Sequence, residues 1–354
     1  MTSSQAPSVR EASLRRTGKL ALNATPGRPR AHLAVSPGAL TYLGGRATIK
    51  WSAAHATRCT LSSTPRFWAG KNPVRVKCNG RITPNVAAAD FPLHWTFTLK
   101  ARNAKGQVAK VRRTLVVHKP PFQVSPNWSG YVVPSATPVT AVAGQFTIPR
   151  LNCKHTTNGG ASTWVGIGGA GGSSGDLLQT GIRSDCVNGA QYDNAAWWEE
   201  YPQLPEIDFH TMSVSPGDSM KASVSQNSDG SWTTRLDDLT TGISGVMTTG
   251  KAYGTVLDSS PTVWLHQEGT AAGVTYAGGY TAEWIVEAFA LSNGFLIRLA
   301  DFGNVAFTSL TTSMPSWGLT GEEQVGIGDD GGFLYAAPSG PDASNYGFSV
   351  TYVG

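Results

Sequence analysis

The chain has 354 residues, which suggests about two domains, each long enough to bury a core of its own. Its net charge of +5 conceals a division, because residues 1–120 hold 21 Lys and Arg against 2 Asp and Glu (+19), whereas residues 121–354 hold 7 against 21 (−14). Two regions of opposite charge argue against one role for the whole chain. No apolar stretch of the sequence is long enough to span a membrane.

Residues 1–30 form a basic segment that is rich in Ser, Thr, Pro and Arg and poor in aromatic residues, which predicts disorder. Its longest apolar patch, Leu20–Leu22, is too short for the apolar core of a signal peptide. This observation leaves three explanations open: the protein stays inside the cell, its leader has been lost from this chain, or its start is mis-assigned.

Residues 31–118 predict a small β-sandwich, because apolar alternating segments recur between Gly and Pro at short intervals. The spacing and composition resemble those of bacterial immunoglobulin-like modules. The Pro-marked stretch that follows predicts a linker over residues 119–126. The expected strands are Ala47–Trp51, Arg58–Ser62, Val74–Cys78, Trp95–Ala101 and Val111–His118.

The four cysteines fall as one pair in each predicted domain, Cys59 with Cys78 and Cys153 with Cys186. Pairing within domains favours two disulfides, and therefore an oxidising compartment, over four buried free thiols. None of the cysteines forms a CxxC motif, so a zinc site is not expected.

Residues 127–354 show almost no helical periodicity. Candidate strands recur between Asn-Gly, Asp-Gly, Gly-Gly and Pro-Gly turn signals, and the whole chain holds 41 Gly and 21 Pro. This pattern predicts a large antiparallel β-sandwich, so the fold class expected for the chain is all-β.

The segment Thr281–Phe289 predicts a strand that places Glu287 on the same face as Ile285 and Phe289. A carboxylate among apolar groups is costly to bury, and burial raises its pKa, which suits a general acid or base. The alternative is an edge-strand Glu that reaches solvent.

A second strand, Leu177–Gly181, carries Gln179 as a lone polar side chain at its centre. The two strands belong to an ordered series of segments that resembles the glutamic peptidases, the eqolisin (peptidase G1) family, over roughly residues 125–354. The resemblance implies a concanavalin A-like sandwich with its site on the concave face of one sheet. The other segments of the series are Asn127–Gly130, Gly144–Pro149, Thr163–Gly168, Trp197–Pro202 and Ala300–Thr308.

By this resemblance Gln179 and Glu287 are the catalytic pair. Glu287 is expected to take a proton from water, and Gln179 to donate to the oxyanion, with no metal or organic cofactor. The resemblance also implies that further residues line the cleft and bind the substrate: Trp128, Trp164, Trp197 and Glu199.

The segment Trp197–Pro202 is expected to form a wall of this cleft. Strand alternation places Trp197, Glu199 and Tyr201 on one face. Trp198 and Glu200 should then face away.

Two positions depart from the fungal pattern, which usually has Asp where Gly168 and Arg183 stand. An Arg close to Glu287 would favour the ionised form of that carboxyl. We therefore expect activity shifted toward milder acid.

The resemblance implies a secreted, extracellular protein of the bacterial type that acts on protein or peptide substrates, and we expect a monomer. The basic N-terminal region is predicted either to bind an anionic cell-surface polymer or to dock on the acidic domain of its own chain. Nucleic acid is not expected, because no recognition motif for it occurs.

Two other classes of function stay open. A β-sandwich glycoside hydrolase also uses paired carboxylates in a cleft, and would need a second one, such as Glu199, within about 5–10 Å of Glu287. A non-catalytic carbohydrate-binding protein or adhesin would tolerate the replacement of Glu287.

Overall fold

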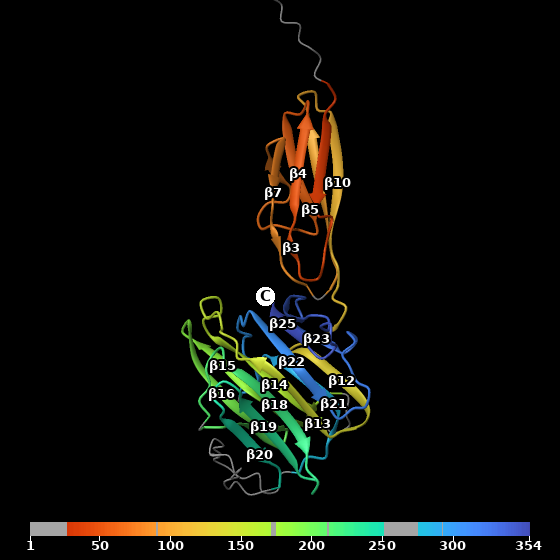
Figure 1. Ribbon diagram of the computed structural model, residues 1–354. Coiled ribbons are helices and arrows are strands. Elements are labelled where there is room, and N and C mark those ends of the chain that lie inside the picture. The colour runs from red at the N-terminus through yellow and green to blue at the C-terminus, as the bar shows by residue number, and fades with distance from the viewer. Residues whose placement is uncertain (1–26, 90, 171–174, 211, 251–274, 292) are drawn as a thin grey trace, which may run out of the picture. The chain divides into compact units, whose positions relative to one another are not determined.

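The computed structural model describes residues 27–354 except 90, 171–174, 211, 251–274 and 292 (Figure 1). Twenty-five β-strands and no helix occur in these residues, which confirms the all-β prediction. The described part of the chain therefore holds no helix of the length and apolarity that crossing a membrane requires. Most of the predicted disordered segment, residues 1–30, lies outside the described residues.

The chain divides into two compact units. The first comprises the described residues up to Ala34 together with Lys50–Arg81 and Phe97–Arg113. The second comprises Val35–Ile49, Ile82–Thr96 and Thr114–Gly354. The disulfide Cys59–Cys78 lies in the first unit and Cys153–Cys186 in the second, so both predicted pairings are confirmed.

The N-terminal strands form two small sheets and a short strand pair. One sheet has the order β1-β4-β7, with β1 at Arg30–Ser36, β4 at Thr48–Ala54 and β7 at Asn79–Ile82. The other has the order β2-β10-β9-β5-β6, with strands at Ala39–Leu40, Val108–Val117, Leu93–Arg102, Arg58–Thr64 and Val74–Val76. The short pair joins β3, Gly45–Arg46, to β8, Asn85–Val86. Each of the five strands expected here overlaps an observed one.

The remaining strands form one fifteen-stranded sheet with the order β17-β16-β15-β14-β21-β12-β23-β24-β25-β22-β13-β18-β19-β20, beside which β11 pairs with β23. The β11–β23 pair is parallel and the pairs along the path are antiparallel. The strands are β11 Gln123–Ser125, β12 Trp128–Val139, β13 Ala141–Thr147, β14 Gly159–Gly168, β15 Leu177–Val187, β16 Ala190–Tyr201, β17 Leu204–Asp208, β18 Ser219–Gln226, β19 Trp232–Asp238, β20 Ser244–Thr248, β21 Gly279–Glu287, β22 Asn304–Thr312, β23 Gln324–Gly328, β24 Leu334–Pro338 and β25 Phe348–Tyr352.

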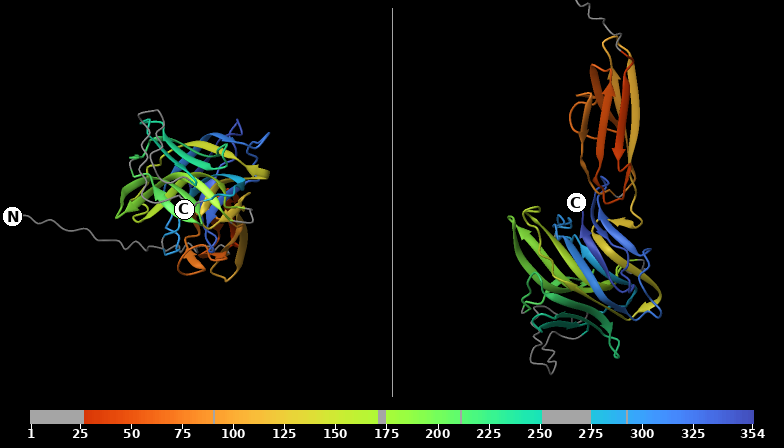
Figure 2. Two further views of the ribbon diagram at one scale, coloured as in Figure 1. Left: turned by 90° about the horizontal axis from the view of Figure 1, so that it is seen from below. Right: turned by 45° about the horizontal axis from the view of Figure 1, so that its top comes forward.

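This sheet folds back on itself, so that β14 and β15 pack against β18 and β16 packs against β20 (Figure 2). The core lies between the two layers and is lined from one side by Ala282, Trp284 and Val286 of β21. Each large apolar side chain buried there contributes about 1.5–3 kcal/mol. The Trp284 indole also donates to the carbonyl oxygen of Ala143 at 3.0 Å and stacks on Trp317.

Period-two alternation in β21 separates the core from the opposite face of the sheet. With Trp284 and its neighbours turned to the core, Ile285 and Glu287 lie on the other face, as predicted, and the alternation places Glu283 there as well. Glu287 therefore stands on the outer side of the layer that contains β16, β15, β14, β21 and β12.

Candidate active site

The registers of neighbouring strands bring Gln179 and Glu199 side by side. In one row across the sheet Glu199 pairs with Gln179, Gln179 with Gly166, and Gly166 with Glu283. A Cβ on Gly166 would lie 3.0 Å from the Cβ of Gln179 and 2.9 Å from Leu177, so the glycine leaves room for both side chains. The buried Gln179 amide donates through Nε2 to Glu199 Oε2 at 2.6 Å.

A second row of large apolar side chains lies beside the first. Trp197 pairs with Gly181, Gly181 with Trp164, and Trp164 with Ile285. A Cβ on Gly181 would lie 2.6 Å from the Cβ of Trp164, so only glycine lets the indole occupy this place. Together with Leu177, the side chains of Trp197, Trp164 and Ile285 form a buried apolar cluster. This cluster separates the row that holds Gln179 and Glu199 from a third row, which holds Glu287.

The third row places Glu287 between Ser162 and Trp128. Glu287 Oε1 accepts a hydrogen bond from Asn127 Nδ2 at 2.8 Å, and Oε2 accepts one from Trp164 Nε1 at 2.7 Å. Burial raises the pKa of Glu287, and the hydrogen bonds from Trp164 and Asn127 oppose the rise by stabilising the anion.

Glu199 is the second perturbed carboxyl of the site. Burial, followed by the negative charge of Glu287, raises its pKa to about 7, while the hydrogen bond from Gln179 opposes the rise. Glu199 is therefore largely protonated in mild acid, where it carries no charge beside the Gln179 amide.

These rows border a cleft of about 1030 Å³. Of the site residues named from the sequence, five line it: Trp128, Gln179, Trp197, Glu199 and Glu287. Trp164 does not: it is fully buried beneath the surface and reaches the site only through its indole N–H. The other lining residues are Asn127, Ser162, Leu177, Arg183, Asp185, Tyr201, Pro205, Glu206, Ile207, Asp208, His210, Phe289, Ala290, Leu291 and Ile297.

Alternation along β16 is as expected. Tyr201 lines the cleft with Trp197 and Glu199, whereas Trp198 lies in the core between the layers. Glu200 is fully buried, and burial, followed by the charges of Asp176 and Glu199, raises its pKa to about 7.

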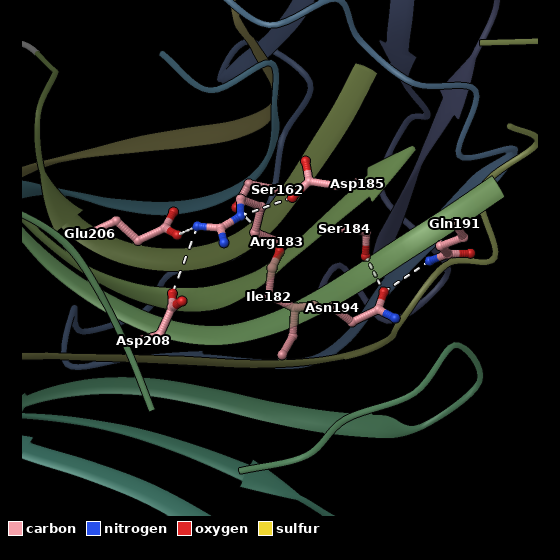
Figure 3. Close-up of polar contacts among 9 residues, drawn as sticks. All are labelled: Ser162, Ile182, Arg183, Ser184, Asp185, Gln191, Asn194, Glu206 and Asp208. Atoms are coloured by element: carbon pink, nitrogen blue, oxygen red, sulfur yellow. Dashed lines mark hydrogen bonds and ion pairs between the residues drawn. The ribbon is translucent and has the colours of Figure 1, made fainter. Parts of the chain in front are cut away.

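Arg183 is held by carboxylates on two strands (Figure 3). Its Nε lies 3.1 Å from Asp185 on β15, and its guanidinium also contacts Glu206 and, at 3.7 Å, Asp208 on β17. The predicted effect of Arg183 on Glu287 is therefore not seen: three carboxylates surround the guanidinium, and the groups that lower the pKa of Glu287 are hydrogen-bond donors.

Three features of the site escaped the sequence analysis. Asn127 donates a hydrogen bond to Glu287. Its position directly before Trp128, in the first segment of the series, is the sequence feature that could have indicated this contact. Two of the three carboxylates around Arg183, Glu206 and Asp208, lie on a strand that the sequence analysis did not single out. Glu283, on the strand of Glu287, is fully buried. No group of three or more His, Cys, Asp or Glu suited to a metal ion occurs within the described ranges.

Comparison with protein families identifies the family of the chain that carries this cleft. The model of the Peptidase A4 family matches residues 126–338, which is more than half of the chain. This chain belongs to the Peptidase A4 family. Membership makes it a hydrolase of the peptidase class, and the match includes every strand that carries the site.

Two sequence relatives agree with the family match. Aspergillopepsin-2 of Aspergillus niger is 30% identical over 252 residues, covering 65% of this chain and 79% of that protein. Scytalidopepsin B of Scytalidium lignicola is 34% identical over 122 residues, covering 34% of this chain and 42% of that protein. The crystal structure of scytalido-glutamic peptidase with a transition state analog inhibitor covers 65% of this chain and 100% of its own, at 22% identity and a TM-score of 0.48.

Proposed function

We propose that this Peptidase A4 member is an endopeptidase that hydrolyses protein substrates at acid to mildly acid pH, with Glu287 as general base and Gln179 as oxyanion donor. The observation that carries the proposal is the placement of both side chains on one cleft, each held by a hydrogen bond of its own. Trp128, Trp197 and Glu199 line the same cleft and would contact the bound peptide.

Glu287 is suited to activate water. Its two oxygens accept hydrogen bonds from Asn127 and Trp164, which fix the carboxylate in one orientation. The ionised carboxylate takes a proton from water as the oxygen attacks the peptide carbonyl carbon. The same proton then passes to the leaving nitrogen as the C–N bond breaks, giving a carboxylic acid and an amine.

Gln179 is suited to stabilise the oxyanion because its amide has two N–H donors and stays neutral at any pH. One donor is engaged by Glu199 Oε2, which fixes the amide plane. The second N–H is then oriented in advance for the oxygen that becomes negative in the tetrahedral intermediate. Loss of one such donor costs about 10²–10³ in rate.

The two carboxyls define a pH window. Glu287 acts only when ionised, so the rate should rise as pH increases through its raised pKa. An ionised Glu199 would place negative charge beside the oxyanion, so the rate should fall as pH increases through about 7. Both effects support an optimum in milder acid, with a bell-shaped profile.

The finer features expected from the sequence belong to this proposal. Residues 127–354 would form a concanavalin A-like sandwich, preceded by an immunoglobulin-like module over residues 31–118 and a linker over 119–126. The protein would be secreted, of the bacterial type and monomeric. The two disulfides support an oxidising compartment.

A glycoside hydrolase is the second candidate function, and one observation favours it. Glu199 and Glu287 line the same cleft, and the charge of Glu287 raises the pKa of Glu199, so a second carboxyl is available near Glu287. Peptidase A4 membership argues for peptide bonds instead, and a Gln at 179 has no role as nucleophile or acid in sugar hydrolysis.

The test is proteolysis of a denatured protein between about pH 2 and 7. Cleavage by the wild-type chain should resist a pepsin-type inhibitor and should fall at least 10²-fold in Glu287→Gln and in Gln179→Ala. The exposed Glu322→Gln variant is the matched control and should keep full activity. Wild-type activity that survives in Glu287→Gln would overturn the assignment, as would cleavage of oligosaccharides but not of protein at any pH.

A further inference from the structure

One face of the five-stranded N-terminal sheet is covered by cations. On β5, β9 and β10 the buried residues are odd-numbered, so the even-numbered side chains point outward. Arg75 of β6 pairs with Thr60 and therefore shares the outward face. The cationic face, as we call it, consists of Arg58, Arg75, Lys100, Arg102, Lys110 and Arg112, all of them exposed.

Nothing on this sheet balances that charge. In the described part of the chain none of the six side chains lies in an ion pair. Residues 27–118 contain 16 Lys and Arg and a single acidic residue, Asp90. Like charges on adjacent strands destabilise a sheet, so the face opposes folding. An anionic partner bound to this face would relieve the repulsion.

The composition of the face narrows the class of partner. The outward positions of β5, β9 and β10 carry no Trp, Tyr or Phe; besides the cations they hold mainly Thr and Ser. On these three strands the outward ring is the imidazole of His94, and a surface without Trp, Tyr or Phe lacks the large rings on which nucleobases or neutral sugars stack. Recognition must therefore rest on charge. Alternate cations along a strand lie about 7 Å apart and neighbouring strands about 4.8 Å apart, which suits an extended polyanion.

We propose that the cationic face binds an extended phosphodiester polymer that carries no stacking bases. Four of its six cations are arginines, whose guanidinium groups match phosphate oxygens in a bidentate manner. The choice of phosphate over carboxylate rests on the acid operating range proposed above. Carboxylates take up protons near pH 4 and lose charge, whereas phosphodiesters keep theirs. This face would then hold the peptidase on a phosphate-bearing surface while it works in acid.

The experiment measures binding of the full chain to poly(glycerol phosphate) at pH 5, independently of proteolysis. One variant changes all six residues of the cationic face to Gln. A matched control removes the same charge from six exposed cations outside the face: Arg28, Arg30, Arg46, Lys50, Lys71 and Arg81. The face variant should bind about 10²–10³-fold more weakly, and its salt dependence should lose about four units of logarithmic slope. Equal weakening in the control, or no wild-type binding at low salt, would overturn the proposal.

Further arms separate the possible sources of negative charge. Polygalacturonate should lose affinity for the chain between pH 6 and pH 3.5, whereas poly(glycerol phosphate) should keep its affinity. Single-stranded DNA with the same number of phosphates should bind no more tightly than poly(glycerol phosphate). Tighter DNA binding would point to nucleic acid and refute the proposal. So would a rise in peptidase activity of the face variant without polymer, because it would show that the face docks on its own acidic domain. Failure of the peptidase assay with intact polymer binding would reject only the proposed catalytic function.

Discussion

At the scale of single residues, the site pairs an amide with a carboxyl whose charge varies with pH. Gln179 donates to Glu199 at 2.6 Å, and the pKa of Glu199 is raised to about 7. A protonated Glu199 still accepts through its carbonyl oxygen, so the anchor persists in acid without a negative charge. In the proposed reaction, Glu199 would therefore act through the orientation of Gln179 and the local charge.

Replacing Glu199 by Gln should change the alkaline limb of the pH–rate profile. A Gln at this position still accepts from the Gln179 amide but never ionises. At pH 8 the wild type should keep about a tenth of its maximal initial rate, and Glu199→Gln most of its own. Glu199→Ala, which removes the anchor, should lose rate at every pH. An unchanged alkaline limb in Glu199→Gln would show that another group controls it.

At the scale of elements, β15 connects the Gln179 amide to the charged residues around Arg183, which line the same cleft. Gln179 and Arg183 stand four residues apart on it and share a face. Arg183 passes over β16 to reach Glu206 and Asp208, so it ties β15 to β17. About a quarter of its side chain is exposed, which limits the energy of the tie.

Arg183→Met should destabilise the fold by about 1–3 kcal/mol at pH 7, because three carboxylates then face one another without a cation. The loss should be smaller in about 1 M NaCl, because salt screens the repulsion among the carboxylates. Urea unfolding at low and at high salt measures the difference. The exposed Arg150→Met is the control and should change stability little at either salt concentration. Equal losses at the two salt concentrations would contradict an electrostatic tie.

At the scale of the whole molecule, the unit that contains the cleft holds buried carboxyl groups, and its folded state is most stable when these groups are protonated. Glu283 is fully buried, accepts a hydrogen bond from Thr281 Oγ1 at 2.9 Å, and has its Oε2 buried without a partner in the described structure. Burial raises its pKa to about 8. With Glu199 and Glu200, both near 7, it favours an acid-stable fold.

Glu283→Gln should flatten the dependence of stability on pH. The folded state holds the Glu283 proton up to about pH 8, whereas the unfolded chain releases it near the ordinary value of 4.5. This contribution is therefore complete below pH 4.5 and is lost as pH rises to 8, on the order of a few kcal/mol. Urea unfolding at pH 5 and pH 8 tests it, with the exposed Glu322→Gln as control. A wild-type slope retained in Glu283→Gln would refute the role of this carboxyl.

Local chemistry determined a large part of this protein from the sequence alone. Period-two alternation in the strand of Glu287 assigned its faces, and turn signals located the strands. The order of short motifs selected Gln179 and Glu287 as a pair. Two cysteines in each domain sufficed to predict the disulfides. These signals act over a few residues, or depend on order along the chain, and need no register.

Only the tertiary structure decided which side chains touch. Glu287 receives a hydrogen bond from Trp164, 123 residues away, because β14 lies beside β21 in one register. A shift of one residue would turn every side chain of a strand to the other face. Such pairings depend on how the sheet folds back and on how distant strands align. Local sequence therefore does not reveal the buried position of Trp164 or the carboxylates around Arg183.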